Sequence, residues 1–198
     1  MNEDVYIILL AGDQKNDGNE LGDESKIRCA KAAQIFNQEN VTGRNVKIIN
    51  SAGCLLFKYP NQKLPLSILM FEYLTETLGL EDYSFLVDHL SLNSAAEIKL
   101  GMDIINNYRE SYSHRRGHVN DYYRITIVSS WYHLPRLKFL WWKYGSKNMP
   151  NPQFAAAGWR PSVRSLIREV GAWIGALTGC RGPRWSRQPN GQIKPKVA

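Results

Sequence analysis

The chain has 198 residues, 43% of them hydrophobic, which suits one α/β domain and is too short for two ordinary domains. Its net charge of +7 lies after residue 157, because residues 158–198 hold eight Lys and Arg but one acid, Glu169. The first apolar run has no basic flank and is too short for a membrane span, so we expect a cytoplasmic protein. A domain is predicted over residues 1–178, followed by a basic, loosely held tail over 179–198.

Short apolar runs alternate with segments of helical length, which is typical of a parallel sheet built from strand–helix–strand units. Strands are predicted at residues 5–11, 46–51, 84–87, 125–129 and 153–157. Helices are predicted at residues 24–38, 66–78, 95–111, 135–144 and 162–177. We expect a Rossmann-like three-layer α/β/α sandwich with a mainly parallel sheet of about five strands in the order 3-2-1-4-5.

In such a sheet the loops that follow the strands meet at one edge, where ligands bind. The first of these loops contains Gly12 and Asp13 and is polar, glycine-rich and long for its position. Two interpretations stay open for it: a mobile lid over a site, or a plain insertion.

The segment at residues 127–136 is the most informative part of the sequence. Pro135 is tolerated only in the first turn of a helix, so the preceding residues lie on a strand-to-helix turn at the edge of the sheet. They are Ser129, Ser130, Tyr132 and His133. Arg136 falls in the first helical turn, where it either binds a phosphate or carboxylate or pairs with an acid such as Asp88 or Asp13. His133 is either a proton donor and acceptor or a structural histidine.

The segment at residues 88–97 contains a second helix start. Ser94 with Glu97 three residues later predicts a capping box, which would give both residues a structural role. Ser91 and Asn93, just before this cap, would then be free to bind a ligand at the same edge as His133.

His114 and His118 have the spacing of a metal pair, but Gly117 and the polar surroundings favour a loop, and no third ligand lies near. We therefore predict no metal site.

Taken together, these segments resemble the YdcF-like family, which includes the SanA and ElyC proteins and is classed as domain of unknown function 218. The blocks that carry the resemblance cover most of residues 5–140. They are LLAGD at residues 9–13, Arg28, Ser51-Ala52-Gly53, DHLSLNSAAE at 88–97 and VSSWYHLPRL at 128–137. The last block is the most specific.

The resemblance implies a Rossmann-like fold that binds a nucleotide-like or phosphorylated ligand, or S-adenosylmethionine, with no agreed reaction. The chain departs from the family pattern at two places: Pro65-Leu66-Ser67 stands where a Ser-Glu-Ala helix start is expected, and Ile98 replaces an Asn. Many relatives carry an N-terminal membrane anchor, which the sequence does not show, so that location does not transfer.

The leading hypothesis is a pocket for a small anionic ligand, hydrolytic or transferring, with His133 as its catalytic residue. Its predicted binding residues are Gly12, Asp13, Arg28, Ser51, Gly53, Ser91, Asn93, Ser129, Ser130, Tyr132 and Arg136. Two alternatives stay open: nucleic-acid or anionic-surface binding through the basic tail, and an assembly module without chemistry. The sequence does not decide the oligomeric state.

Overall fold

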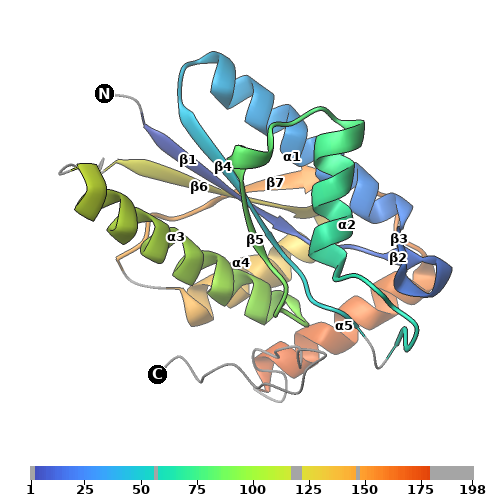
Figure 1. Cartoon of the computed structure of the whole chain (residues 1–198). Helices are drawn as coiled ribbons and strands as arrows, with labels where there is room; N and C mark the ends of the chain where they lie inside the picture. Colours follow the sequence, from blue (N-terminus) through green and yellow to red (C-terminus); the bar gives the residue numbers. More distant parts are fainter. Residues whose placement is uncertain (1–2, 56–57, 117–121, 146–147, 179–198) are drawn as a thin grey trace.

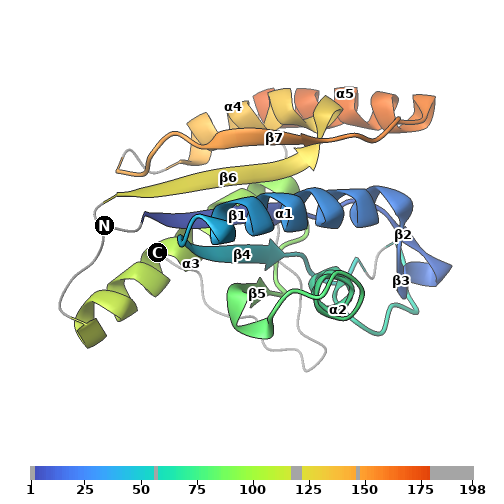
Figure 2. The same ribbon diagram turned by 90° about the horizontal axis from the view of Figure 1, so that it is seen from above.

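Five parallel strands form the centre of the molecule. The computed structural model describes residues 3–55, 58–116, 122–145 and 148–178 (Figure 1). The strands are β1 (Asp4–Leu10), β4 (Asn45–Ser51), β5 (Phe85–Asp88), β6 (Tyr123–Ser130) and β7 (Gln153–Ala157). Seen from above in Figure 2, they lie in the order β5-β4-β1-β6-β7, which is the predicted order 3-2-1-4-5. The predicted basic tail and His118 lie outside the described residues.

Helices cover both faces of this sheet. They are α1 (Asp23–Val41), α2 (Leu66–Glu72), α3 (Ser94–Arg116), α4 (Leu134–Tyr144) and α5 (Val163–Leu177). A π-helical turn, Tyr73–Thr77, continues α2. The predicted Rossmann-like α/β/α sandwich is confirmed. Among the helices in the described part of the chain, none is long and apolar enough to cross a membrane.

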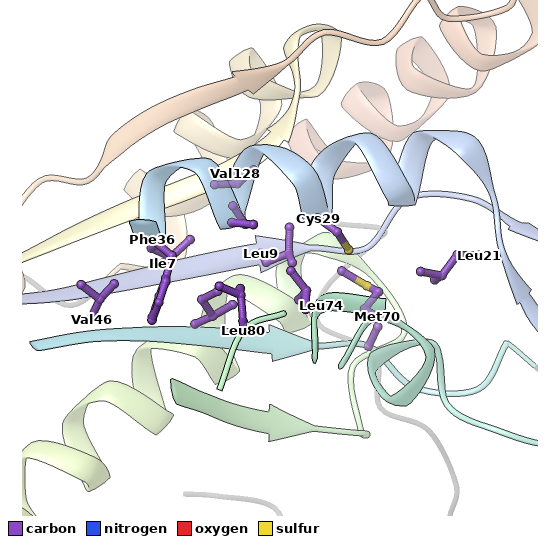
Figure 3. Packing of buried hydrophobic residues seen from close by; sticks show 14 of the residues in the cluster. Ile7, Leu9, Leu21, Cys29, Phe36, Val46, Met70, Leu74, Leu80 and Val128 are labelled. Carbon is purple, nitrogen blue, oxygen red and sulfur yellow. The ribbon is translucent and has the colours of Figure 1, made fainter. Parts of the chain in front are cut away.

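Alternating side chains of β1 divide the core into two layers. Ile7 and Leu9 pack against α1 and α2, through residues such as Phe36 and Met70 (Figure 3). On the other face, Tyr6, Ile8 and Leu10 belong to a second cluster, which includes Ile98 of α3, Leu137 and Leu140 of α4 and Ala176 of α5. Because β1 is buried on both faces from Val5 to Leu10, this part of its sequence is an unbroken apolar run.

The long loop after β1 contains a small hairpin. Strands β2 (Gln14–Lys15) and β3 (Glu20–Leu21) pair in antiparallel fashion around a 3-10 turn at Asn16–Gly18. Asn19 ties this hairpin to a neighbouring loop, because its amide nitrogen donates to the carbonyl of Asn61 and its amide oxygen accepts from the backbone N–H of Lys63. The loop predicted as a lid or an insertion therefore carries structure of its own and is fastened at its tip.

Candidate functional site

A cavity of about 950 Å³ lies beyond the carboxyl ends of β1 and β6. The chain runs from β1 to β4 on one side of the sheet and returns from β5 to β6 on the other, so the strand order reverses between β1 and β6. Parallel sheets bind ligands at this reversal. Seven of the predicted binding or catalytic residues line the cavity: Gly12, Asp13, Arg28, Asn93, Tyr132, His133 and Arg136.

A buried cluster around Glu24 joins α1 to the end of β6. One oxygen, Oε1, accepts from Arg28 Nη2 at 2.5 Å, from the Ser130 hydroxyl at 2.6 Å and from the Tyr132 hydroxyl at 2.8 Å. Arg28 also donates from Nε to Ser130 Oγ at 3.0 Å and from Nη1 to the carbonyl of Ala11. Its side chain is only 2% exposed. Arg28 is therefore fixed in the inner wall, and Ser130 supports it without lining the cavity.

The charge of Glu24 is stabilised by these contacts. Burial alone would raise the pKa of Glu24, but the positive charge of Arg28 and the two hydroxyl hydrogen bonds outweigh it, so the pKa falls below its usual value. Burial and the neighbouring carboxylate raise the pKa of the Tyr132 hydroxyl well above its usual value. The cluster is thus a carboxylate, a guanidinium and two neutral hydroxyls.

A second cluster joins α4 to α5 through Glu169. Arg136 donates from Nε to Glu169 Oε1 at 2.7 Å and from Nη2 to Oε2 at 3.2 Å, a two-pronged ion pair. His133 Nδ1 lies 2.5 Å from the same Oε2. Of the two interpretations of Arg136, the structure therefore shows pairing with an acid, but the acid is Glu169 rather than Asp88 or Asp13.

His133 is oriented between two carboxylates. Burial lowers the pKa of its ring, and the hydrogen bond to Glu169 raises it by less, so the neutral imidazole is favoured near pH 7. Burial raises the pKa of Glu169, but its bonds with His133 and Arg136 outweigh this and lower it, so Glu169 is ionised and accepts the Nδ1 proton. The other nitrogen, Nε2, is then unprotonated and lies 3.7 Å from Glu24 Oε1. Such a ring can accept a proton at Nε2.

Exposed cations stand on the rim of the cavity. Lys58 lies over the ring of Tyr59, at 4.4 Å from its centroid. Arg160 and Arg168 also line the cavity and are exposed. Within the described part of the chain, neither arginine has a hydrogen bond or an ion pair. The lining holds five Lys and Arg against the carboxylates of Asp13, Glu24 and Glu169, and so carries excess positive charge.

Two other predicted residues of the lining are helix caps. Asp13 Oδ1 accepts the backbone N–H of Ser25 in the first turn of α1, and its carbonyl accepts the N–H of Gly22. A Cβ atom at Gly22 would stand 2.1 Å from the Asp13 carboxyl carbon, so a side chain there would displace the cap. Asn93 Oδ1 accepts the backbone N–H of Ala96 in the first turn of α3. Both residues hold the helix starts that face the cavity.

The predicted capping box of Ser94 and Glu97 is wrong, since Asn93 supplies the cap. Glu97 instead crosses to β1, where its Oε1 accepts the backbone N–H of Ala11 at 3.1 Å. The Glu97 carboxyl is buried, and burial raises its pKa to about 7, against the lowering effect of the Ala11 hydrogen bond and of Arg28. Glu97 is thus a buried carboxyl group with a raised pKa, and it contacts the backbone directly before Gly12.

Five predicted binding residues do not line the cavity. Ser51 and Ser91 form a buried network with Asp88 at the ends of β4 and β5: their hydroxyls lie 2.6 Å apart and 2.9 and 3.2 Å from Asp88 Oδ2. The carbonyl of Ser91 accepts the backbone N–H of Gly53. Ser129 is buried, and its hydroxyl has no partner in the described residues. Ser130 belongs to the Glu24 cluster.

Sequence reasoning missed four residues of the site: Glu24, Glu169, Arg160 and Arg168. The spacing of Glu24 and Arg28 on one predicted helix was a usable signal, because residues four apart are neighbours on a helix. Glu169 was visible as the single acid of a basic segment. No local signal pointed to Arg160 or Arg168.

His114 lies in α3 rather than in the predicted loop, and the described residues contain no group of three or more His, Cys, Asp or Glu able to hold a metal ion. The chain matches no protein-family model, no curated protein and no solved structure.

Proposed function

We propose that the cavity binds a small anionic ligand of the nucleotide or sugar-phosphate kind. The observation that carries this proposal is the pair Arg160 and Arg168, which line the cavity without a partner in the described residues. An exposed guanidinium exchanges water for phosphate oxygens at little desolvation cost and can bind them in two-pronged fashion.

The charge balance favours a phosphorylated ligand over S-adenosylmethionine. The paired arginines of the inner wall are already neutralised by Glu24 and Glu169, so the free positive charge is concentrated at the rim. S-adenosylmethionine has a sulfonium and an ammonium group against a single carboxylate, so this rim would repel its net positive charge, whereas it would attract a phosphate. The volume of about 950 Å³ is sufficient for a nucleotide.

His133 is proposed as the proton acceptor of a hydrolysis or transfer reaction in this cavity. Glu169 accepts the hydrogen bond from Nδ1–H, so Nε2 can take the proton of a water or hydroxyl whose oxygen attacks the phosphorus. As the P–O bond to the leaving group breaks, the protonated ring can return that proton to the leaving oxygen. Membership of the YdcF-like family is proposed on the same residues, because the block at 128–137 supplies both His133 and Arg136.

The binding proposal is tested by thermal shift with ATP, glucose 6-phosphate, inorganic phosphate and S-adenosylmethionine. We expect a phosphorylated compound to raise the Tm of the wild type, and Arg168→Ala and Arg160→Ala to weaken its binding about tenfold. Arg164→Ala is the matched control, since Arg164 is an exposed arginine of α5 that does not line the cavity. Equal losses in all three variants would reject the rim as the recognition element.

Catalysis is tested separately with His133→Gln. If His133 is the proton acceptor, this variant keeps the ligand-induced rise in Tm and loses phosphate release from the bound compound by about 10²-fold or more. If the wild type binds the compound but never releases phosphate, the cavity is a binding site without this reaction.

A further inference from the structure

The outward face of α5 is apolar, which reverses the usual pattern of a surface helix. Its exposed large side chains are Val163, Leu166, Ile167, Val170, Ile174 and Leu177. Successive positions turn by about 100° on a helix, so these six fall on one side. The buried residues of α5 are Glu169, Gly175 and Ala176, which are acidic or small. The helix thus packs by its narrow side and presents its broad apolar side outward.

This apolar face continues onto α4. The ring of Phe139 lies 5.8 Å from Trp173 of α5 and 5.9 Å from Trp142 of α4, measured between centroids. Trp142 is 78% exposed. Figure 1 shows α4 and α5 next to each other, and Lys143 Nζ on α4 donates to the carbonyl of Ala176. The two helices therefore form one surface with an exposed tryptophan at its border.

The charges around this surface are positive. Arg164 and Arg168 of α5 are exposed, and Arg160 precedes the helix. The single acid of residues 158–198, Glu169, is turned inward and neutralised by Arg136. A partner at this face therefore meets apolar side chains flanked by guanidinium groups and no carboxylate from this segment.

We propose that the apolar face of α5 docks on a lipid bilayer that carries anionic headgroups. A helix of this length is about 22 Å long and can lie in the interface plane, with its apolar side among the acyl chains and its arginines among the phosphates. Trp142 suits the same depth, because tryptophan concentrates at the boundary between lipid and water. The proposal shares Arg160 and Arg168 with the rim of the cavity, but it rests on the exposed large apolar side chains of α5, which do not line the cavity.

Two other occupants fit less well. A second copy of the chain would bring the arginines of two α5 helices together, and like charges oppose such a contact. The segment 179–198 adds five basic residues, and its large apolar residues besides Cys180 are Trp185, Ile193 and Val197, which are too few to cover six exposed side chains. An anionic membrane satisfies both the apolar and the basic part of the face.

The test is sedimentation of the full-length protein with phosphatidylcholine vesicles, with and without about a quarter of phosphatidylglycerol. We expect binding to the anionic vesicles, weakened by high salt and reduced about tenfold or more in the double variant Ile167→Asn with Ile174→Asn. Val41→Asn is the matched control: this residue, at the end of α1, is 88% exposed and lies on the opposite face of the sheet. It should bind as the wild type does.

Three outcomes would overturn the proposal. The wild type does not sediment with anionic vesicles, or the double variant sediments as well as the wild type. In the third, analytical ultracentrifugation without lipid shows a dimer that the double variant converts to a monomer, which would assign the face to a second copy. Circular dichroism of the double variant checks that its fold is kept.

Discussion

The inner wall and the rim of the cavity use arginine in opposite ways. Arg28 and Arg136 on the inner wall are largely buried, and each is bound to a carboxylate: Arg28 to Glu24 of the same helix, and Arg136 to Glu169 of α5. Arg160 and Arg168 on the rim are exposed and have no partner in the described residues. A buried charge must be paired, whereas an exposed one stays hydrated until a ligand arrives. The arginines of the inner wall therefore fix the geometry of the cavity, and those of the rim are available to bind a ligand.

The largest effect is expected from removing the inner carboxylate Glu24. Glu24→Ala leaves Arg28 buried and unpaired and should lower the free energy of unfolding by about 3–5 kcal/mol. Asp23→Ala is the control, because the neighbouring Asp23 forms an exposed ion pair with Lys15 and should matter little. Urea denaturation measures both. Equal stabilities would show that the inner pair is not a structural requirement.

Glu97 is an inner acid of a different kind, since its carboxyl is bonded to a backbone amide and not to an arginine. Its raised pKa means that the unfolded chain loses this proton near pH 4.5 and the folded chain near pH 7, so stability falls as pH rises between these values. At pH 8, Glu97→Gln should be more stable than the wild type by about 3 kcal/mol, and near pH 4.5 the two should agree.

Thermal melts at several pH values measure this difference. Glu110→Gln, which alters an exposed glutamate of the same helix, serves as the control. A Glu97→Gln variant whose advantage is the same at pH 4.5 and pH 8 would contradict the assigned titration.

In Glu169→Gln, Arg136 of the inner wall loses its charged partner and comes to resemble the unpaired arginines of the rim. It removes the charge that neutralises Arg136 and should cost about 1–3 kcal/mol of stability. The cavity gains one unit of positive charge, so binding of a phosphorylated ligand should tighten severalfold. Isothermal titration and urea denaturation measure the two effects. Weaker binding would mean that Arg136 needs Glu169 in order to face the ligand.

The smallest effect concerns the rim itself. Arg168→Ala should leave the free energy of unfolding within about 0.5 kcal/mol of the wild type, because it breaks no contact in the described residues. Arg164→Ala should behave in the same way. A marked loss confined to Arg168→Ala would show that this rim arginine is a structural one.

The fold was largely predictable from the sequence because each central strand is a short apolar run between helix-length segments. The right-handedness of crossover connections and the short loops then leave few topologies for the sheet, and the expected strand order is the observed one. The edge that holds His133 and Arg136 followed from the same logic, since Pro135 marks the start of α4.

The pairing within the site was not predictable. Glu169 reaches His133 across 36 positions of sequence, and that contact depends on how α5 packs beside α4. Asn93 and Ser94 are both residue types that cap helices, so the sequence alone does not choose between them. In the structure Asn93 is the cap, and Glu97 contacts Ala11 instead of completing a capping box. The serines at 51 and 91 were expected at the ligand but bind each other, because buried hydroxyls need partners inside the protein.

The dependence of His133 on Glu169 also sets an order of assembly during synthesis. The strands and the other described helices precede α5 in the chain, and α5, which is translated after them, supplies the Glu169 carboxylate that orients His133 and Arg136. A nascent chain that lacks α5 therefore lacks the carboxylate that both side chains contact. His133 and Arg136 reach the arrangement described for the cavity only when the last described helix has emerged and docked.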